Sequence, residues 1–551
     1  MVDRSAGASA SPPPGPPPGR PSRNAPARAA RTLGLSTLIF SAATGLSRVA
    51  GLIREVVAAG LFGTGGAASA FTFAFQIPNL VRALVADAAL SSAFVPVFTE
   101  LHERRRRREA ALLAGSLFGL IIVALGVLTL LFIALAGVIV PPLTGDAFSS
   151  ELDGLTVGLT RLMFPIVVLL GLNGLVVGML NSMNHFTVPA IAPLVWNLVI
   201  IACLVALTPL FSGGDRLYAY AIGVLAGTVV QFVMVLPGLR RAGLFIPVNF
   251  NFRDPRIGRV LKLMFPVTLS LGLINIDLVL NTVLGSLVSA EAPRAIDAAF
   301  RIYMLPQGIF SVAVATVLFP SLSRLAARGD LAGLRGVAAS GTRQIALTLI
   351  PAAVAMGLLA EPITRLVFER GAFDADSTRR TQEALAIFAI SLPFAGANLL
   401  LTRAFFSLQR PWMPTTLAAG SLVINAAVSL AFYESLGIAG IVLGTAVGSV
   451  AMTLAQVALL RRETGGFELP RTLGAVARIG VASLALGISA FELHDLLDGA
   501  LGRSLAGQAI SLGTALAVGI GVYAALIWML RVPEARLLVE LLTRRLRRSR
   551  S

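Results

Sequence analysis

Long apolar stretches recur along the whole chain and are separated by short polar connections. The stretch from 41 to 100 shows the pattern, because two apolar runs in it are joined by the turn Gly63-Thr64-Gly65-Gly66. A helix needs about 20 apolar residues to cross a bilayer core about 30 Å thick. The pattern predicts 14 membrane-spanning helices, at roughly 34–62, 67–98, 111–142, 155–180, 187–210, 217–238, 259–288, 295–320, 342–367, 381–405, 413–434, 436–460, 473–491 and 506–530.

Basic residues gather in alternate connections between these spans. Arginines follow the second, sixth, eighth, twelfth and fourteenth spans, and the run Arg104–Arg108 follows the second. The connections 143–154 and 492–498 carry acidic residues instead, whereas 369–380 is mixed. Lys and Arg are concentrated in the cytoplasmic connections of membrane proteins. The alternation therefore predicts two cytoplasmic termini and an even number of spans.

The predicted spans fall into two groups of six and a final pair. Phe75-Gln76-Ile77 stands 19 residues before Phe94, and Phe300-Arg301-Ile302 stands 19 residues before Phe319. A duplication of six spans preserves orientation, so the match suggests two six-helix lobes of the kind known in alternating-access transporters. The expected parts are a disordered basic cytoplasmic tail (1–33), an N-lobe (34–240), a C-lobe (241–462), helices 13 and 14 (463–530) and a basic cytoplasmic tail (531–551).

The composition points to the same class of protein. The 551 residues are 56% hydrophobic and 13% charged, with a mean hydropathy of +0.82, whereas soluble domains carry roughly 25% charged residues. We therefore expect an all-α polytopic membrane protein. The net charge of +17 is explained by topology rather than by nucleic-acid binding. Cys203 is the single cysteine, and His102, His185 and His494 are scattered, so no metal site, no cofactor and no intrachain disulfide is expected.

Charged side chains interrupt the first two spans. Arg48, Arg54, Glu55, Arg82 and Asp87 all lie within them. An Arg near the centre of a membrane helix costs from about 2.5 to more than 10 kcal/mol, so such residues are kept where they face a wet cavity, a partner or a substrate. The bases outnumber the acids, and the planar fork of Arg matches phosphate oxygens. The pattern predicts a cavity that binds a phosphate or diphosphate.

The eighth span contains a further pair of charges. Asp297 and Arg301 are four residues apart with the acid first, which is the favourable order for an ion pair within a helix. Two interpretations stay open for the buried charges. They are either neutralised pairs that fix contacts between helices, or a substrate site in which Glu55, Asp87 and Asp297 support the arginines.

Polar residues in the seventh span suggest a site for a coupling cation. Asp277 and Asn281 are four residues apart and share one face of the predicted helix. A carboxylate with a nearby amide inside a membrane helix can hold Na⁺ or a transferable proton. A hydrogen-bonded contact between helices would explain the same pattern.

Several ordered motifs resemble those of one known family. The first is Ser47-Arg48-Val49-x-Gly51-x-x-Arg54-Glu55, and Pro78-Asn79-Leu80-x-Arg82 follows it. Phe62-Gly63 and Ala70-Phe71 lie between these two motifs. The motifs after them are Ser92-Ala93-Phe94-Val95-Pro96, Leu180-Asn181 with His185-Phe186, Pro189-Ala190, Pro193 and Asn197, Arg301 with Pro306, Gly308, Val317-Leu318, Pro320 and Leu322-Ser323, and Phe368-Glu369-Arg370-Gly371-x-Phe373. Over roughly residues 34–530 the chain resembles the MurJ (MviN-type) lipid II flippases.

This resemblance implies a multidrug/oligosaccharidyl-lipid/polysaccharide exporter fold of 14 helices, in which helices 13 and 14 lie beside a groove for a lipid tail. It implies transport of lipid II, an undecaprenyl-diphosphate muropeptide, from the inner to the outer leaflet of the bacterial cell membrane. Membrane lipids and cell-wall synthesis proteins are the implied partners. The positions that match the family's essential cavity arginines are Arg48, Arg54, Arg82 and Arg301.

The chain also departs from the family's pattern at two positions. Ser69 stands where an acid is common, and Asn281 stands where some members carry an acid linked to Na⁺, with Asp277 one turn earlier. Coupling to Na⁺, to H⁺ or to the membrane potential therefore stays open.

The expected mechanism is alternating access, with the diphosphate held by arginines while the isoprenoid tail stays in lipid. No bond is made or broken, so the chain is not expected to be an enzyme. Three alternatives remain at this point. They are an exporter of a drug or another lipid-linked oligosaccharide, a membrane glycosyltransferase or polymerase that acts on a lipid diphosphate, and a scaffold without transport activity.

Overall fold

The computed structural model describes residues 25–85, 88–104, 106–183, 185–241, 248–252 and 254–535. Within these ranges the chain forms helices and no strand, which confirms the expected all-α class. Ten helical segments among the described residues are long and apolar enough to cross a membrane. One of them, α15 (Trp412–Thr464), is divided by Gly437, whose φ of 56° and ψ of −131° reverse the chain. The total of 14 spans stays a prediction.

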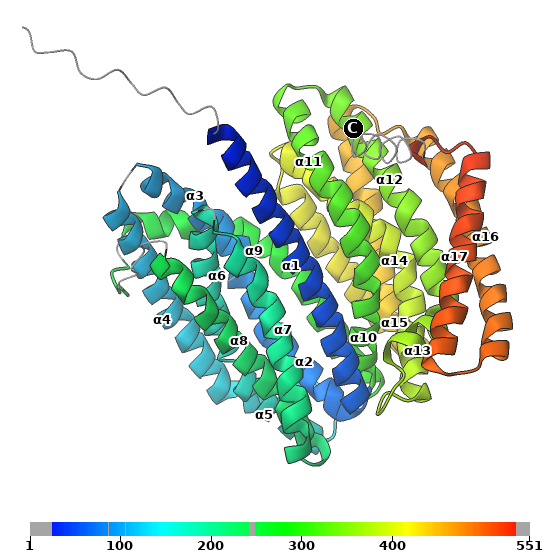
Figure 1. The fold of residues 1–551 in the computed structure, drawn as a ribbon, viewed down its shortest axis with the longest axis horizontal. Helices are drawn as coiled ribbons and strands as arrows, with labels where there is room; N and C mark the ends of the chain where they lie inside the picture. Colours follow the sequence, from blue (N-terminus) through cyan, green and yellow to red (C-terminus); the bar gives the residue numbers. More distant parts are fainter. Residues whose placement is uncertain are drawn as a thin grey trace, which may run out of the picture.

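The helices form two groups (Figure 1). In the first group α1 packs on α7, and α2 packs on α5. We call this group the first lobe; it consists of α1 (Ala25–Phe62), α2 (Gly66–Val85), α3 (Ala88–Glu103), α4 (Arg107–Ile139), α5 (Ser150–Met163), α6 (Ile166–Ser182), α7 (Thr187–Leu207) and α8 (Arg216–Arg241).

The second group is built around α14, which packs on α10, α12 and α15. We call it the second lobe; it consists of α9 (Pro255–Val288), α10 (Ala292–Pro306), the π-helical turn η4 (Gln307–Ser311), α11 (Val312–Ala327), α12 (Leu331–Leu358), α13 (Ala360–Phe368), α14 (Ala375–Ser407) and α15. The helix α9 also packs on α2 and α3, so it connects the two lobes.

Two further helices lie at the outer edge of the second lobe (Figure 1). They are α16 (Leu469–Leu501) and α17 (Leu505–Met529), which pack on each other, and α16 packs on α12. Buried Arg343 on α12 pairs with Glu534 and, at 3.1 Å, with Glu468, while Arg365 pairs with Asp498. These ion pairs tie both ends of the α16–α17 hairpin to the second lobe.

The ends of the predicted tails differ from expectation. The helix α1 begins at Ala25 rather than near 34, because the segment from 25 to 31 is rich in Ala and Arg, which are strong helix formers. At the other end, Val532 and Glu534 are buried, so the start of the predicted tail 531–551 packs against α12 and α16. In Figure 1 the start of α1 and the end of α17 lie at the same end of the molecule.

Helix boundaries within the lobes follow local chemistry. Several predicted spans are two helices in series; Pro165, for example, is the N-cap of α6, so the predicted span 155–180 contains the break between α5 and α6. Asp254 caps α9 by accepting a hydrogen bond from the backbone N–H of Arg256 at 2.9 Å. The Arg256 guanidinium, which also bonds this carboxyl, lowers the pKa of Asp254. A cap of this kind places a negative charge at the positive end of the helix dipole.

Candidate substrate site

Buried charges meet where α1 of the first lobe faces α10 of the second. Arg54 and Glu55 are adjacent on α1, and both are at least 93% buried. Glu55 Oε1 accepts a hydrogen bond from Arg54 Nη2 at 2.6 Å. Arg301 Nη1 approaches the same oxygen at 3.4 Å, and Arg294 Nη2 approaches Oε2 at 3.3 Å. Glu55 therefore joins the two lobes through long ion pairs, while its shortest bond stays within α1.

The helix α10 supplies three charges from one face. Arg294, Asp297 and Arg301 are spaced three and four residues apart, so they lie one above another on that helix. Arg294 Nη1 lies 2.8 Å from Asp297 Oδ2, and Arg301 Nη2 lies 3.2 Å from Asp297 Oδ1. With Arg54 and Glu55 the cluster holds three arginines and two carboxylates, a net charge of +1. We call these five residues the charge cluster.

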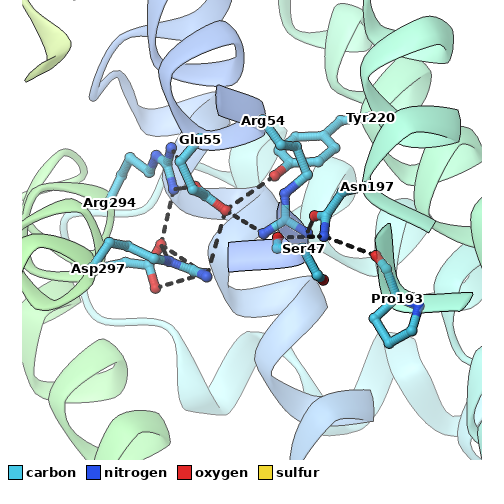
Figure 2. A network of polar contacts seen from close by, with 9 residues as sticks. Ser47, Arg54, Glu55, Pro193, Asn197, Tyr220, Arg294 and Asp297 are labelled. Atoms are coloured by element: carbon cyan, nitrogen blue, oxygen red, sulfur yellow. Dashed lines mark hydrogen bonds and ion pairs between the residues drawn. The ribbon is translucent and has the colours of Figure 1, made fainter. Parts of the chain in front are cut away.

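A fixed support on α7 orients Arg54. Its Nη1 donates to Asn197 Oδ1 at 3.1 Å, and Asn197 Nδ2 donates to the Pro193 and Ser47 carbonyls at 2.9 and 3.4 Å. Figure 2 shows this chain of contacts running from α10 through Glu55 and Arg54 to Asn197. The Arg54 guanidinium also lies over the Trp196 ring, 4.8 Å from its centroid, which is a favourable cation–π geometry.

A small cavity adjoins the charge cluster. It holds about 20 Å³, and it is lined by the cluster together with Phe71, Thr72, Phe75, Gln76, Trp196, Tyr220 and Val224. A cavity of that size has room for about one water. The lobes are therefore closed on each other at this depth in the state that the structure shows.

Close contacts also join the lobes at the turn between α1 and α2. The Ala372 N–H donates to the Gly60 carbonyl at 2.8 Å, and Thr64 Oγ1 donates to Ser377 Oγ at 2.9 Å. Gly63 and Gly371 have φ of +60° and +59°, and a Cβ on either would collide with the facing backbone. Only glycine fits both the left-handed conformation and the close approach. We call this contact the glycine seal.

The structure brings four of the predicted site residues together. Arg54, Glu55, Asp297 and Arg301 form the charge cluster. Their arginines are paired with carboxylates, so the positive excess is one charge rather than a set of unpaired arginines. The pairs fix contacts between the lobes, as the first interpretation expects, and they leave an excess of one positive charge. The interpretation as a substrate site stays a prediction.

The other predicted residues lie apart from the cluster. Exposed Arg48 donates to the Gly308 carbonyl at 3.5 Å, where α1 meets η4. Arg82 Nη2 donates to Asn79 Oδ1 on the same helix at 2.7 Å. Asp87 lies outside the described residues. Arg48 and Arg82 thus lie on α1 and α2 nearer than the cluster to the end of the molecule where α1 begins.

Sequence reasoning missed Arg294, which is 95% buried and bonds both Glu55 and Asp297. Arg294 lies in the first turn of α10, directly after Pro293. From the sequence alone, an arginine at such a helix start is expected at the membrane surface. The spacing of Arg294, Asp297 and Arg301, which places them on one helix face, is the sequence pattern that could have identified Arg294. Its backbone N–H also donates to Ser69 Oγ at 3.2 Å, so the departure at Ser69 lies beside the cluster.

A second polar cluster lies between α9 and α15. Asn425 Nδ2 lies 2.6 Å from Asp277 Oδ1 and 3.1 Å from Asn281 Oδ1, and Asn281 Nδ2 donates to Thr445 Oγ1 at 2.9 Å. Ser429 Oγ lies 3.0 Å from Asn425 Oδ1. Asp277 and Asn281 therefore do face one site, in which Asp277 supplies the carboxylate.

The arrangement of two helical lobes with a charged site between them matches a known fold, that of the multidrug/oligosaccharidyl-lipid/polysaccharide exporters. Solved structures support that fold. "Lipid II flippase MurJ, inward closed conformation" matches with a TM-score of 0.73 at 24% identity, covering 89% of this chain and 98% of that one. An inward-facing multidrug resistance MATE family transporter matches with a TM-score of 0.66 at 14% identity, covering 78% of this chain and 98% of that one.

Sequence comparison then specifies the family. The model of the family "Lipid II flippase MurJ" matches residues 58–507. The probable lipid II flippase MurJ of Rhizobium meliloti (strain 1021) is 33% identical over 490 residues, which cover 87% of this chain and 90% of that protein. The lipid II flippase MurJ of Burkholderia cenocepacia is 33% identical over 430 residues, which cover 77% of this chain and 83% of that protein. The chain belongs to the MurJ lipid II flippase family.

Proposed function

We propose that this chain moves lipid II from the inner to the outer leaflet of the bacterial cell membrane by alternating access. The observation that carries the proposal is the excess of arginine over carboxylate in the charge cluster, which lies between the two lobes. A diphosphate carries the opposite charge, and Arg forks bind its oxygens in pairs. Both termini are then cytoplasmic, and the glycine seal faces outward.

Transport follows from competition between Glu55 and the substrate. The diphosphate enters from the cytoplasmic side past Arg48 and Arg82 and reaches Arg301 and Arg294. These arginines meet Glu55 only at 3.3 to 3.4 Å, so a diphosphate with more charge displaces it. Loss of the Glu55 contacts releases the second lobe, and the lobes rock to expose the head group outside. The isoprenoid tail remains in lipid, beside α16 and α17.

Depletion of the protein in cells tests the proposed function. Lipid II is expected to accumulate in the inner leaflet, measured by its accessibility to a membrane-impermeant probe. An exporter of another lipid-linked oligosaccharide or of a drug would leave the leaflet distribution of lipid II unchanged. An enzyme acting on the lipid diphosphate would instead form a product with purified protein, and a scaffold would tolerate loss of the cluster arginines.

Gly371→Ala is expected to open the glycine seal. The added Cβ would collide with the Gly60 backbone, and Ala disfavours the φ of +59°. A cysteine introduced by Ser69→Cys, in a Cys203→Ser background, is then expected to react with an impermeant thiol reagent from outside at least about 5-fold faster, since a clash of this kind costs more than about 1 kcal/mol. Gly329→Ala is the control, because Gly329 has a similar φ of +69° but nothing within 4 Å. Equal labelling of the two variants would contradict this role.

Asp277 is proposed as the group that couples transport to a cation. Asp277→Asn keeps an oxygen toward Asn425 but removes the charge that would hold Na⁺ or a proton. Translocation in proteoliposomes is expected to become insensitive to imposed Na⁺ and pH gradients, while the response to membrane potential persists. Asp215→Asn, in the short turn just before α8, is the control. A variant that kept the wild-type response to both gradients would exclude Asp277.

A further inference from the structure

A polar stripe runs along α2 beside the charge cluster. Ser69, Thr72, Gln76 and Asn79 follow at intervals of three and four residues, so they share one face of an otherwise apolar helix. Ser69, Thr72 and Gln76 are buried, with exposures of 0, 4 and 8%, and Asn79 is half-buried. The stripe leads from Arg82, which bonds Asn79, to the cavity at the cluster.

Gln76 is the residue of this stripe that has unused hydrogen-bonding capacity. It lines the cavity, and its buried Oε1 has no hydrogen-bond partner among the residues that the structure describes. Buried side-chain acceptors are normally satisfied, so each exception calls for an explanation. An unpartnered acceptor beside a substrate site is explained if a donor on the substrate forms the missing hydrogen bond with it.

The wall around Gln76 is aromatic. Phe71 stacks on Tyr220 with ring centroids 4.0 Å apart, and Phe75 lies next to Phe71 at 6.1 Å. Trp196 also lines the cavity, and the Arg54 guanidinium lies over its ring, 4.8 Å from the centroid. Ligand sites commonly combine apolar and aromatic walls with a few placed polar groups. Here the aromatic rings, one open amide oxygen and adjacent arginines suit a sugar joined to a phosphate.

We propose that the pocket formed by Phe71, Phe75, Gln76 and Trp196 binds the sugar ring attached directly to the diphosphate of the substrate. This inference rests on the proposed function. Gln76 Oε1 accepts a hydrogen bond from a sugar hydroxyl or amide N–H, and the aromatic rings pack against the ring carbons. The arginines of α10 hold the diphosphate at the mouth of the pocket. The present cavity of about 20 Å³ admits the sugar once α10 withdraws with the second lobe.

Binding of two ligands to purified protein in lipid nanodiscs tests the proposal. Lipid II carries the sugar, and undecaprenyl diphosphate lacks it. Gln76→Met keeps the length of the side chain and removes the amide. Gln456→Met is the matched control, because Gln456 is also buried with an unpartnered Oε1 within the described residues but lies on α15. Phe75→Leu is the second test variant, and thermal melting checks that each variant is folded.

Gln76→Met is expected to weaken lipid II binding about 5- to 10-fold, the loss of one neutral hydrogen bond, and to leave undecaprenyl diphosphate binding unchanged. Phe75→Leu is expected to act in the same direction, and Gln456→Met to change neither ligand. Unchanged lipid II binding in both test variants, or equal weakening of both ligands, would overturn the sugar pocket. Arg301→Ala separates the two proposals, because it weakens both ligands if the cluster binds the diphosphate and neither if the proposed function is wrong.

Discussion

Arg301→Ala is expected to abolish lipid II translocation while leaving the protein folded. The variant lowers the net charge of the cluster from +1 to zero, because Arg54 and Arg294 remain with Glu55 and Asp297. Each hydrogen bond between charged groups contributes roughly 1.5–3 kcal/mol. Two such bonds to a diphosphate correspond to a loss of about 10²- to 10⁴-fold in affinity. No carboxylate is left without a basic neighbour, so the melting temperature is expected to change little.

Translocation in proteoliposomes at matched protein content measures this effect. Arg301→Lys is expected to be intermediate, because Lys keeps the charge but loses the planar fork. Arg161→Ala is the control, since exposed Arg161 on α5 bonds the Ile133 carbonyl of α4 at 3.0 Å and does not line the cavity at the cluster. Translocation by Arg301→Ala at the rate of the Arg161→Ala control would refute the assignment of the diphosphate to this cluster.

Glu55→Gln is expected to tighten ligand binding and to slow turnover. The change leaves three arginines with Asp297 alone, so the net charge of the cluster rises to +2. Removing one partner of a buried ion pair typically costs about 3–5 kcal/mol, so the empty, closed state loses stability. The diphosphate no longer competes with a carboxylate, so undecaprenyl diphosphate is expected to bind at least about 10-fold more tightly, a gain of about 1.4 kcal/mol. The step in which the empty lobes close again becomes limiting.

Equilibrium binding and translocation are measured on the same preparation, to check that binding becomes tighter while turnover becomes slower. Asp297→Asn is the informative comparison, because Asp297 lies on α10 with both of its arginine partners and makes its ion pairs within one helix. That variant is expected to strengthen binding without loosening the closure of the lobes. Weaker binding by Glu55→Gln would show that Glu55 organises the arginines for the substrate rather than competing with it.

The sequence predicted the helical class and most of the charged site, but neither the breaks within several spans nor the way in which the site is neutralised. Arg54, Glu55, Asp297 and Arg301 could be selected because ionised residues are rare within apolar spans. The pair of Asp297 and Arg301 is local, and its spacing alone predicts the observed 3.2 Å contact. Arg294 could not be selected in the same way, because its position after Pro293 places it at a helix start in the sequence.

What the sequence by itself determined is the class of structure and the chemical character of the site. In a bilayer each spanning segment must satisfy its own backbone hydrogen bonds, so the apolar runs dictate helices locally. Only the tertiary structure decided which charges meet. Glu55 and Arg294 are separated by 239 residues, and the long contacts between them exist because two separately formed lobes close on each other. Contacts of that kind depend on the packing of whole lobes, which no local pattern of residues specifies.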